Sequence, residues 1–310
     1  MKTTSLTLSA LAFVSCAPAS DLDPSRIDEP RFLAVRMEPP EATPGTTNVT
    51  FTALIASPDG TVASGSIDWA WCLDPRLPTD TTNIPARCST SSAHLTPFAS
   101  GGFSTHAVVP SDACSLVGPS LPPTGPDAHP QRVPDPDSTG AYSIPARASW
   151  NRTDAFDTAF ARVRIECPRG DVPSDVAIAY AALAQPNHNP TIARVDRVDR
   201  DGRIVPVTSD EVVSSGADLA LALTVSADSA EQYARISNDG RSVEQGVETL
   251  DVSWFAAGGR FDANRTIVAD GTARNVLHVD TGTARAVTIW MIVRDGRGGT
   301  EWREFRWAVQ

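Results

Sequence analysis

The sequence predicts an all-β protein made of two tandem β-sandwiches. Apolar and polar residues alternate with a period of two along most apolar stretches, which is the pattern of half-buried strands. Five Asp-Gly pairs separate these stretches, and such pairs supply the positive φ of tight hairpin turns. A polar segment with a Pro near each end, 185–190, divides the strands into two sets. Together these features predict two sandwich domains, 31–186 and 187–310.

The first domain opens with a strand whose alternate residues are Leu33, Val35 and Met37. A Pro-rich turn leads into a second strand around 49–55, and a third follows at 67–71. Residues 73–145 then hold 13 of the 25 Pro residues and little alternation, so we expect a long Pro-rich loop insertion there. Alternation resumes at 161–165 and again around Val176 and Ile178, which predicts the closing strands.

The second domain reads as six strands, expected near 191–198, 217–226, 247–256, 273–280, 284–294 and 300–309. This number of strands in about 120 residues is typical of a sandwich with Greek-key connections. Trp254 lies where such a fold buries an aromatic side chain between its sheets.

The N-terminus, 1–15, reads as a signal peptide. Lys2 precedes an apolar run at 6–14 that is too short to span a bilayer. Phe13-Val14-Ser15-Cys16 resembles the lipobox of bacterial lipoproteins. That resemblance implies a lipidated Cys16 at the start of the mature chain, followed by a tether over 16–30, with the membrane as a partner through the lipid. Ala17 next to it favours the outer membrane, whereas an ordinary secretory signal cleaved after Ala19 is the alternative.

Four cysteines remain after Cys16, an even number that suits an oxidising compartment. They are Cys72, Cys88, Cys114 and Cys167. Four cysteines allow three pairings, of which we favour Cys72 with Cys88 and Cys114 with Cys167. A zinc site that includes His94 or His106 is the competing interpretation, but the sequence has no CxxC or HxxxH pair.

Four segments of the mature chain carry a resemblance to a known family: 32–45, 69–72, 135–142 and 293–299. They resemble segments of the Ig-like lipoproteins of myxobacteria and related bacteria, and the last is also similar to the Asp-Gly-Arg-Gly-Gly hairpin of PKD and cadherin-like modules. The resemblance covers nearly the whole mature chain. It implies Ig-like or PKD-like sandwiches and no catalytic residues.

Composition and motifs narrow the function. A net charge of -11 argues against nucleic acid as a partner. The sequence has no GxSxG, HExxH, SxxK or P-loop, so we predict no enzyme, no catalytic residues and no cofactor. The segment 135–140 begins like a calcium loop, but Ala146 stands where the bidentate Glu belongs, so we predict a turn and no metal.

The sequence therefore predicts an exported, lipid-anchored cell-envelope protein with a binding or structural role. Its partner would be an envelope protein or a glycan, and the 73–145 insertion is the expected binding region. The alternative is a carbohydrate-binding accessory module that stacks sugars on exposed aromatic side chains. The candidates for that role are Trp69, Trp71, Trp290, Trp302 and Trp307.

Overall fold

A computed structural model describes residues 23–80, 82–120, 132–135, 139–151, 156–199, 201–209, 211–282 and 285–310. Within these ranges the chain is almost entirely β, which confirms the predicted class. The signal peptide, Cys16 and the first part of the predicted tether lie outside the described residues. No helix in the described ranges is long and apolar enough to cross a membrane.

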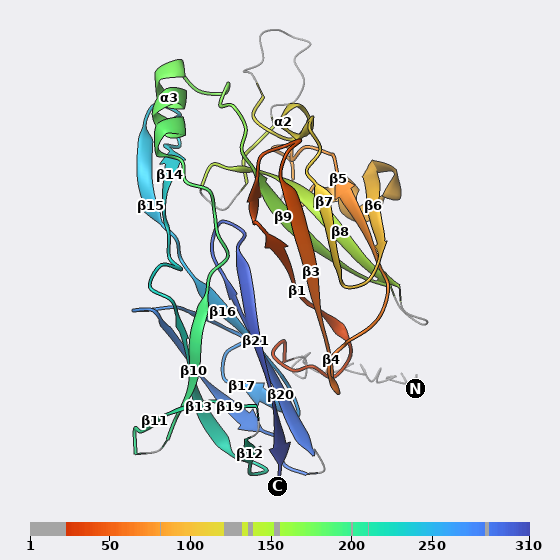
Figure 1. The fold of residues 1–310 in the computed structure, drawn as a ribbon, viewed down its shortest axis with the longest axis vertical. Coiled ribbons are helices and arrows are strands. Elements are labelled where there is room, and N and C mark those ends of the chain that lie inside the picture. Colours follow the sequence, from red (N-terminus) through yellow and green to blue (C-terminus); the bar gives the residue numbers. More distant parts are fainter. Residues whose placement is uncertain are drawn as a thin grey trace, which may run out of the picture.

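The first half of the chain forms two sheets (Figure 1). One sheet contains β1 (Arg31–Glu38), β3 (Asn48–Ser57) and β4 (Gly60–Thr61), with β7 (Ser104–Val108) paired to β3. The other has the order β2 (Glu41–Ala42), β9 (Phe156–Ile165), β8 (Tyr142–Asn151), β5 (Ile67–Cys72) and β6 (Leu95–Gly101). The first sheet therefore ends at β1, while β9 is paired on one side to β8 and on the other only to the short strand β2.

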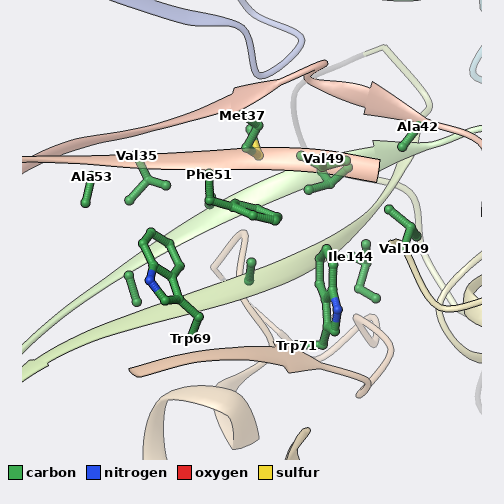
Figure 2. Close-up of a cluster of buried hydrophobic side chains, with 14 of the residues drawn as sticks. Val35, Met37, Ala42, Val49, Phe51, Ala53, Trp69, Trp71, Val109 and Ile144 are labelled. Atoms are coloured by element: carbon green, nitrogen blue, oxygen red, sulfur yellow. The ribbon is translucent and has the colours of Figure 1, made fainter. Parts of the chain in front are cut away.

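The core of this sandwich is aromatic (Figure 2). Phe51 on β3 reaches across to the opposite sheet, where its ring centroid lies 5.7 Å from that of Trp69 and 5.5 Å from that of Trp71. Val35 and Met37 on β1 line the same interior, as their alternation predicts. Leu33, which the alternation places on the same face, instead lies at the β1 bulge between Phe32 and Ala34 and packs in a separate cluster.

The second half forms two five-stranded sheets and a separate two-stranded ribbon. One sheet contains β11 (Ile204–Pro206), β10 (Ile192–Val198), β13 (Asp218–Val225), β19 (Thr272–Val279) and β17 (Gly259–Phe261). The other contains β12 (Val212–Val213), β21 (Thr300–Val309), β20 (Ala286–Arg294), β16 (Asp251–Ala257) and β18 (Arg265–Ile267). The ribbon is β14 (Gln232–Ile236) with β15 (Val243–Val247). All six predicted strands are present, as β10, β13, β16, β19, β20 and β21.

Trp254 on β16 is fully buried between these sheets, as predicted. Its ring lies 5.3 Å from that of Phe261, and its indole N–H donates to the Thr266 hydroxyl at 2.8 Å. The indole of Trp307 likewise donates to the backbone carbonyl of Thr208. Each large side chain therefore enters the core with its one polar group paired.

The predicted insertion 73–145 requires correction. It contains β6 and β7, which are integral strands of the two sheets, and its last residues begin β8. Its remaining described parts are loops with short helices, α1 (Ala86–Thr90), η1 (Ser92–His94) and α2 (Ala113–Leu116). The weak alternation of β6 and β7 reflects their position, because neither strand buries a residue completely.

The closing strand predicted around Val176 and Ile178 is wrong. Residues Ser174–Leu183 form helix α3, which begins after Pro173 and has Asp175 in its first turn. Val176, Ile178 and Tyr180 do alternate, but the intervening alanines favour a helix, and only Val176 is buried. β9 instead closes the first sandwich.

Hairpin turns follow the Asp-Gly pairs with one exception. Gly60, Gly202, Gly240 and Gly271 all have positive φ. At Asp295-Gly296 the residue with positive φ is Gly298, because the Asp295 side chain itself organises the turn by accepting from the amides of Arg297 and Gly299, both at 2.8 Å.

The C-terminal part of the predicted tether is not free. Ser25 and Ile27 hydrogen-bond through their backbones to Ala256 on β16, and both are buried. Ile27 contributes to an apolar cluster with residues of both halves. The chain is therefore already docked on the second half by Ser25.

Candidate functional site

The two halves meet along the outer faces of two sheets. On one side, Leu33 and Ala34 at the bulge of β1, with Leu54 and Ala56 on β3, point away from the first core. On the other, Trp290 and Ile292 on β20, with Ala257 on β16, point away from the second core. These residues form one buried cluster, so the two sandwiches share an apolar junction.

This junction accounts for the burial pattern of β20. Val287, Ile289 and Met291 fill the second core, while Trp290 and Ile292 fill the junction, so seven consecutive residues of the strand are buried. A half-buried strand would alternate instead, with only one of its faces buried. The apolar character of both its faces was the signal that a second layer covers it.

A polar contact adjoins the apolar junction. The indole N–H of Trp290 donates to the hydroxyl of Thr61 on β4 at 2.8 Å, and that hydroxyl donates to the carboxylate of Glu304 on β21 at 2.6 Å. The β3–β4 hairpin is thereby seated on β20 and β21.

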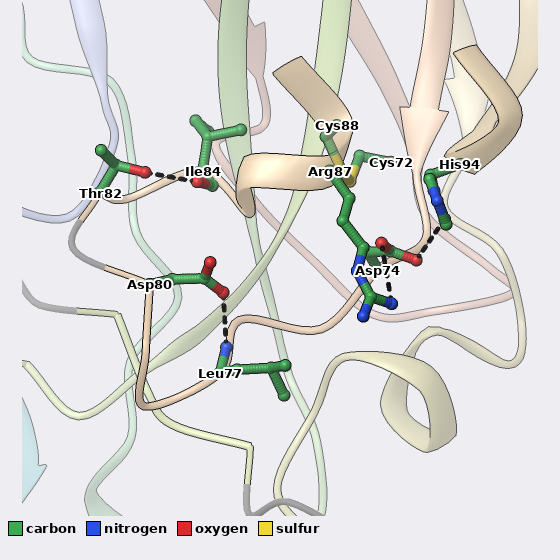
Figure 3. The surroundings of a disulfide bond; sticks show 9 residues. All are labelled: Cys72, Asp74, Leu77, Asp80, Thr82, Ile84, Arg87, Cys88 and His94. Atoms are coloured by element: carbon green, nitrogen blue, oxygen red, sulfur yellow. Dashed lines mark hydrogen bonds and ion pairs between the residues drawn. A yellow bond between two sulfur atoms is a disulfide. The ribbon is translucent and has the colours of Figure 1, made fainter. Parts of the chain in front are cut away.

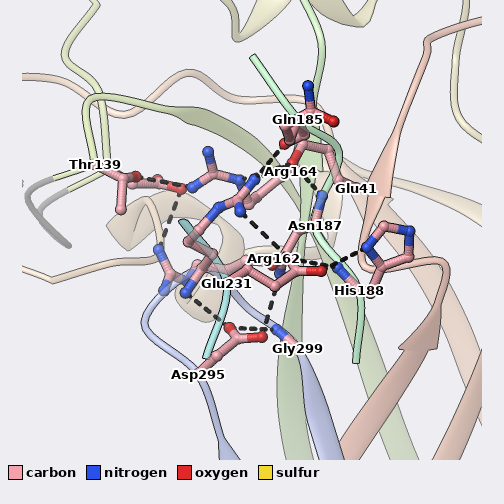
Figure 4. Close-up of polar contacts among 12 residues, drawn as sticks. Glu41, Thr139, Arg162, Arg164, Gln185, Asn187, His188, Glu231, Asp295 and Gly299 are labelled. Atoms are coloured by element: carbon pink, nitrogen blue, oxygen red, sulfur yellow. Dashed lines mark hydrogen bonds and ion pairs between the residues drawn. The ribbon is translucent and has the colours of Figure 1, made fainter. Parts of the chain in front are cut away.

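Arg297 organises a second, charged part of the junction. Figure 4 shows several of the residues that it contacts, among them Glu41, Gln185 and Glu231. Its side chain is only 2% exposed. Its guanidinium lies 3.1 Å from the carboxylate of Glu41, 3.3 Å from that of Glu248 and 3.5 Å from that of Glu231. It also donates to the backbone carbonyl of Gln185 and stacks over the ring of Tyr233. Arg297, in the turn between β20 and β21, therefore contacts the first half, the second half and the segment that connects them.

Carboxylates outnumber arginines in this buried cluster. Glu41, Glu231, Glu248 and Asp295 face Arg297 and Arg164, whose side chain is 5% exposed and lies 3.4 Å from Glu41. Burial, with the nearby charge of Asp295, raises the pKa of Glu248 to about 7. Burial also raises the pKa of Asp295. The junction therefore has a carboxyl group that gains a proton near neutral pH.

The connecting segment 185–190 is held from both sides. The amide of Asn187 donates to Glu41, and the side chain of Asn187 donates to Asp295. Asn189 donates to the carbonyl of Met37 on β1, and its side-chain oxygen accepts from the amide of Thr300 on β21. The segment predicted as a polar joint between the domains is therefore hydrogen-bonded to both halves.

The β14–β15 ribbon supplies a further contact. It extends from the second half to lie beside α3 (Figure 1). α3 is fixed at its other side by Arg169, whose guanidinium stacks between Tyr142 and Tyr180 and pairs with Asp171 at 2.8 Å. The outer face of α3 is apolar, with Ile178 71% and Leu183 45% exposed.

A cleft of about 630 Å³ opens beside the junction. Its walls are β1, β9, the loop at Asn83 and Ile84, and the turn between β20 and β21, and its lining includes Arg31, Phe160 and Arg294. The cleft cannot be predicted from the sequence, because it is assembled from four segments far apart in the chain; one of them belongs to the 73–145 region expected to bind a partner.

Both favoured disulfides are formed. Cys72 joins Cys88 with a Cα–Cα distance of 5.8 Å, and Cys114 joins Cys167 with one of 5.6 Å. Figure 3 shows the first, where Cys88 on α1 is attached to the end of β5. Nearby, Asp74 pairs with His94 at 3.1 Å, so that histidine is engaged by a carboxylate beside the disulfide. All four cysteines are used in disulfides, which leaves none for the zinc site considered above.

The exposed aromatic platforms that the carbohydrate-binding alternative requires are not formed by four of the five candidate tryptophans. Trp69, Trp71, Trp290 and Trp307 are at most 3% exposed, and all four fill cores or the junction. Trp302 is partly buried against the junction cluster. The side chains that would form a flat exposed surface are therefore packed inside.

The remaining candidates for metal binding or catalysis are histidines and acidic residues. Within the described ranges, no three His, Cys, Asp or Glu side chains are grouped to hold a metal ion. His278 lies between the carboxylates of Asp218 and Asp262, and His188 pairs with Glu231. His129 and part of the 135–140 segment lie outside the described residues.

No family model matches the chain, and no curated protein matches it. Among solved structures, the D0-D1 domain of intimin aligns at 10% identity over 89% of this chain and 98% of its own, with a TM-score of 0.22. The Yersinia pseudotuberculosis adhesin InvE aligns at 10% identity over 92% of this chain and 56% of its own, with a TM-score of 0.23. The fold assignment accordingly rests on the strand pairing described above.

Proposed function

We propose that the chain is an exported, lipid-anchored protein of the bacterial cell envelope that acts by binding or as a structural element, without catalysis. The junction is the observation that supports this proposal. An apolar cluster, the Arg297 network and the bound connecting segment couple two sandwiches into one body. Such a body suits the presentation of a surface at a fixed orientation.

The cysteines support export. Two disulfides form where thiols are oxidised, as they are outside the cytoplasm. The lipid anchor at Cys16 remains a proposal from the lipobox-like motif. Asp23 lies only seven positions after Cys16, a reach of at most about 25 Å. A lipid on Cys16 would thus hold the folded body close to the membrane surface.

Metabolic labelling with an alkyne fatty acid tests the anchor. The wild-type protein should carry the label and fractionate with membranes, whereas Cys16→Ser should lose the label and become soluble in the periplasm. Ala17→Ser is the matched control, since it changes the adjacent residue and keeps the thiol. An unlabelled wild-type protein would refute the anchor. A hydrolase activity abolished by substitution of one His or Ser would refute the non-catalytic role.

A further inference from the structure

The cleft beside the junction exposes strand edges whose backbone groups are not used in pairing. On β3, the amide of Ala53 donates to Phe103, away from β1. Val35 is the partner of Ala53 in the β1–β3 register, so its N–H and C=O point away from β3 toward the cleft. Within the described chain, no hydrogen bond reaches either group.

The same reasoning applies to β9. The amide of Arg164 donates to Pro40 rather than to β8, so the even-numbered residues of β9 direct their backbone groups outward. Phe160 is one of these residues and lines the cleft. No partner for its N–H or C=O is found in the described ranges. Each of these strand edges therefore offers free donors and acceptors, as in sites that bind a peptide as an added strand. β1 and β9 lie too close together to admit a strand between them, so a peptide can pair with only one edge at a time.

Two arginines in the cleft have only neutral acceptors. Arg31 donates to the carbonyls of Pro24 and Arg26 and stacks over Phe255. Arg294 donates to the hydroxyl of Ser253 at 2.9 Å and to the carbonyl of Leu33 at 2.8 Å.

In the described part of the chain neither arginine forms an ion pair with a carboxylate. Ser253 and Phe255 lie two residues apart on β16, so the two guanidiniums are neighbours. Burial lowers the pKa of both arginines, and nearby carboxylates offset this lowering only in part.

The acids that line the cleft do not neutralise these cations. Asp157 accepts from the amides of Phe32 and Thr158 with its two oxygens. Asp295 is occupied by backbone amides of its own turn and by Asn187. The carboxylates nearest to the two cations, Asp28 and Glu29 for Arg31 and Asp251 for Arg294, act only at longer range, so neither guanidinium has a carboxylate in direct contact within the described ranges.

We propose that this cleft binds an extended peptide with an acidic side chain, which Arg31 and Arg294 hold by its carboxylate while one open strand edge, at Val35 or at Phe160, hydrogen-bonds its backbone. The volume of about 630 Å³ lies within the range of about 300–1,000 Å³ typical of ligand sites. An arginine pair favours a carboxylate through charge-assisted hydrogen bonds. The proposal rests on the proposed binding role and specifies its site and ligand class.

The test uses the full chain with Cys16→Ser and a fluorescein-labelled octapeptide of alternating Glu and Val, followed by fluorescence anisotropy at low salt. We expect saturable binding. Replacing each Glu by Gln in the peptide, or methylating alternate amides, should weaken binding by about tenfold or more. The Arg31→Gln/Arg294→Gln protein should lose affinity similarly, while Arg274→Gln, an exposed arginine on β19, should not.

The Gln and N-methylated peptides test the proposed contacts even if the Arg31→Gln/Arg294→Gln protein fails to fold. Absence of saturable binding, or equal affinity for the Gln or the methylated peptide, would overturn the proposal. Displacement of the peptide by glutarate at comparable concentration would assign the cleft to a small dicarboxylate instead. Each of these results leaves the fatty-acid labelling of Cys16 unaffected, so failure of this site is distinguishable from failure of the proposed function.

Discussion

Arg297 and Glu41 lie 256 residues apart in the sequence, and their side chains meet 3.1 Å apart inside the junction. Glu41 is on the short strand that pairs with β9, whereas Arg297 is in the turn between the last two strands. The same Glu41 carboxylate accepts from the amide of Asn187 in the connecting segment. This single ion pair therefore links the first sandwich, the connection and the second sandwich.

Replacing Arg297 by Ala should lower the free energy of unfolding by about 3–5 kcal/mol, because it leaves buried carboxylates without their cation. Urea denaturation followed by tryptophan fluorescence measures the loss. Arg274→Ala is the control and should change stability by no more than about 0.5 kcal/mol. A double variant with Glu248→Gln should recover part of the loss, since the two side chains are coupled. Equal stability of the two arginine variants would contradict the role given to the network.

Glu248 makes stability depend on pH. Its pKa is raised from 4.5 to about 7, so the folded protein holds a proton that the unfolded chain releases. The free energy of unfolding should therefore fall as pH rises from about 4.5 to about 7. Glu248→Gln should flatten this dependence over the same window. Urea denaturation of both proteins at pH 5, 6, 7 and 8 isolates the contribution of Glu248, because other titrating groups are common to both. Parallel curves would contradict the assignment.

The core residues of both sandwiches can be predicted from the sequence, because the alternation of apolar and polar residues in a strand depends only on residues that are neighbours in the chain. The inward residues of β1 and β3, such as Val35 and Phe51, share one side of an alternating run, and the sandwich needs only that information. Trp254 is predicted between the sheets because its strand occupies the position at which a sandwich buries an aromatic side chain. The favoured disulfide pairing also followed from short spacing, since Cys72 and Cys88 are 16 residues apart.

The junction and the cleft could not be predicted in this way. Arg297 and Glu41 are charged residues in turns and short strands, where a solvated side chain is the ordinary expectation. Their burial depends on how two complete sandwiches pack. α3 was misassigned because Val176 and Ile178 alternate over too few residues to separate a strand from an alanine-rich helix.

The two disulfides should contribute unequally to stability. In the chain-entropy model, closing the 16-residue separation of Cys72 and Cys88 contributes about 3 kcal/mol, and the 53-residue separation of Cys114 and Cys167 about 4 kcal/mol. Paired Cys→Ala variants, compared by urea denaturation under non-reducing conditions, measure each contribution. The variant of Cys114 and Cys167 should be the less stable of the two. The opposite order would indicate that native contacts near α1, rather than loop closure, dominate.

The turn at Asp295 offers a test of packing with an internal control. A Cβ added at Gly299 would lie 2.9 Å from the backbone carbonyl oxygen of His188 and would overlap the Asp295 carboxylate, whereas one added at Gly296 would meet no atom within 4 Å. Neither glycine has a positive φ, so backbone strain does not separate the two positions.

Gly299→Ala should therefore lower the free energy of unfolding by about 1–3 kcal/mol through overpacking. Gly296→Ala should be neutral or stabilise slightly, because it only restricts the unfolded chain. Urea denaturation compares the two proteins. Amide hydrogen exchange over 185–190 should speed up in Gly299→Ala alone, since Asp295 accepts a hydrogen bond from Asn187 and the added Cβ would press on the carbonyl of His188. Similar exchange and stability in the two variants would show that the turn does not pack against the connection as tightly as its geometry indicates.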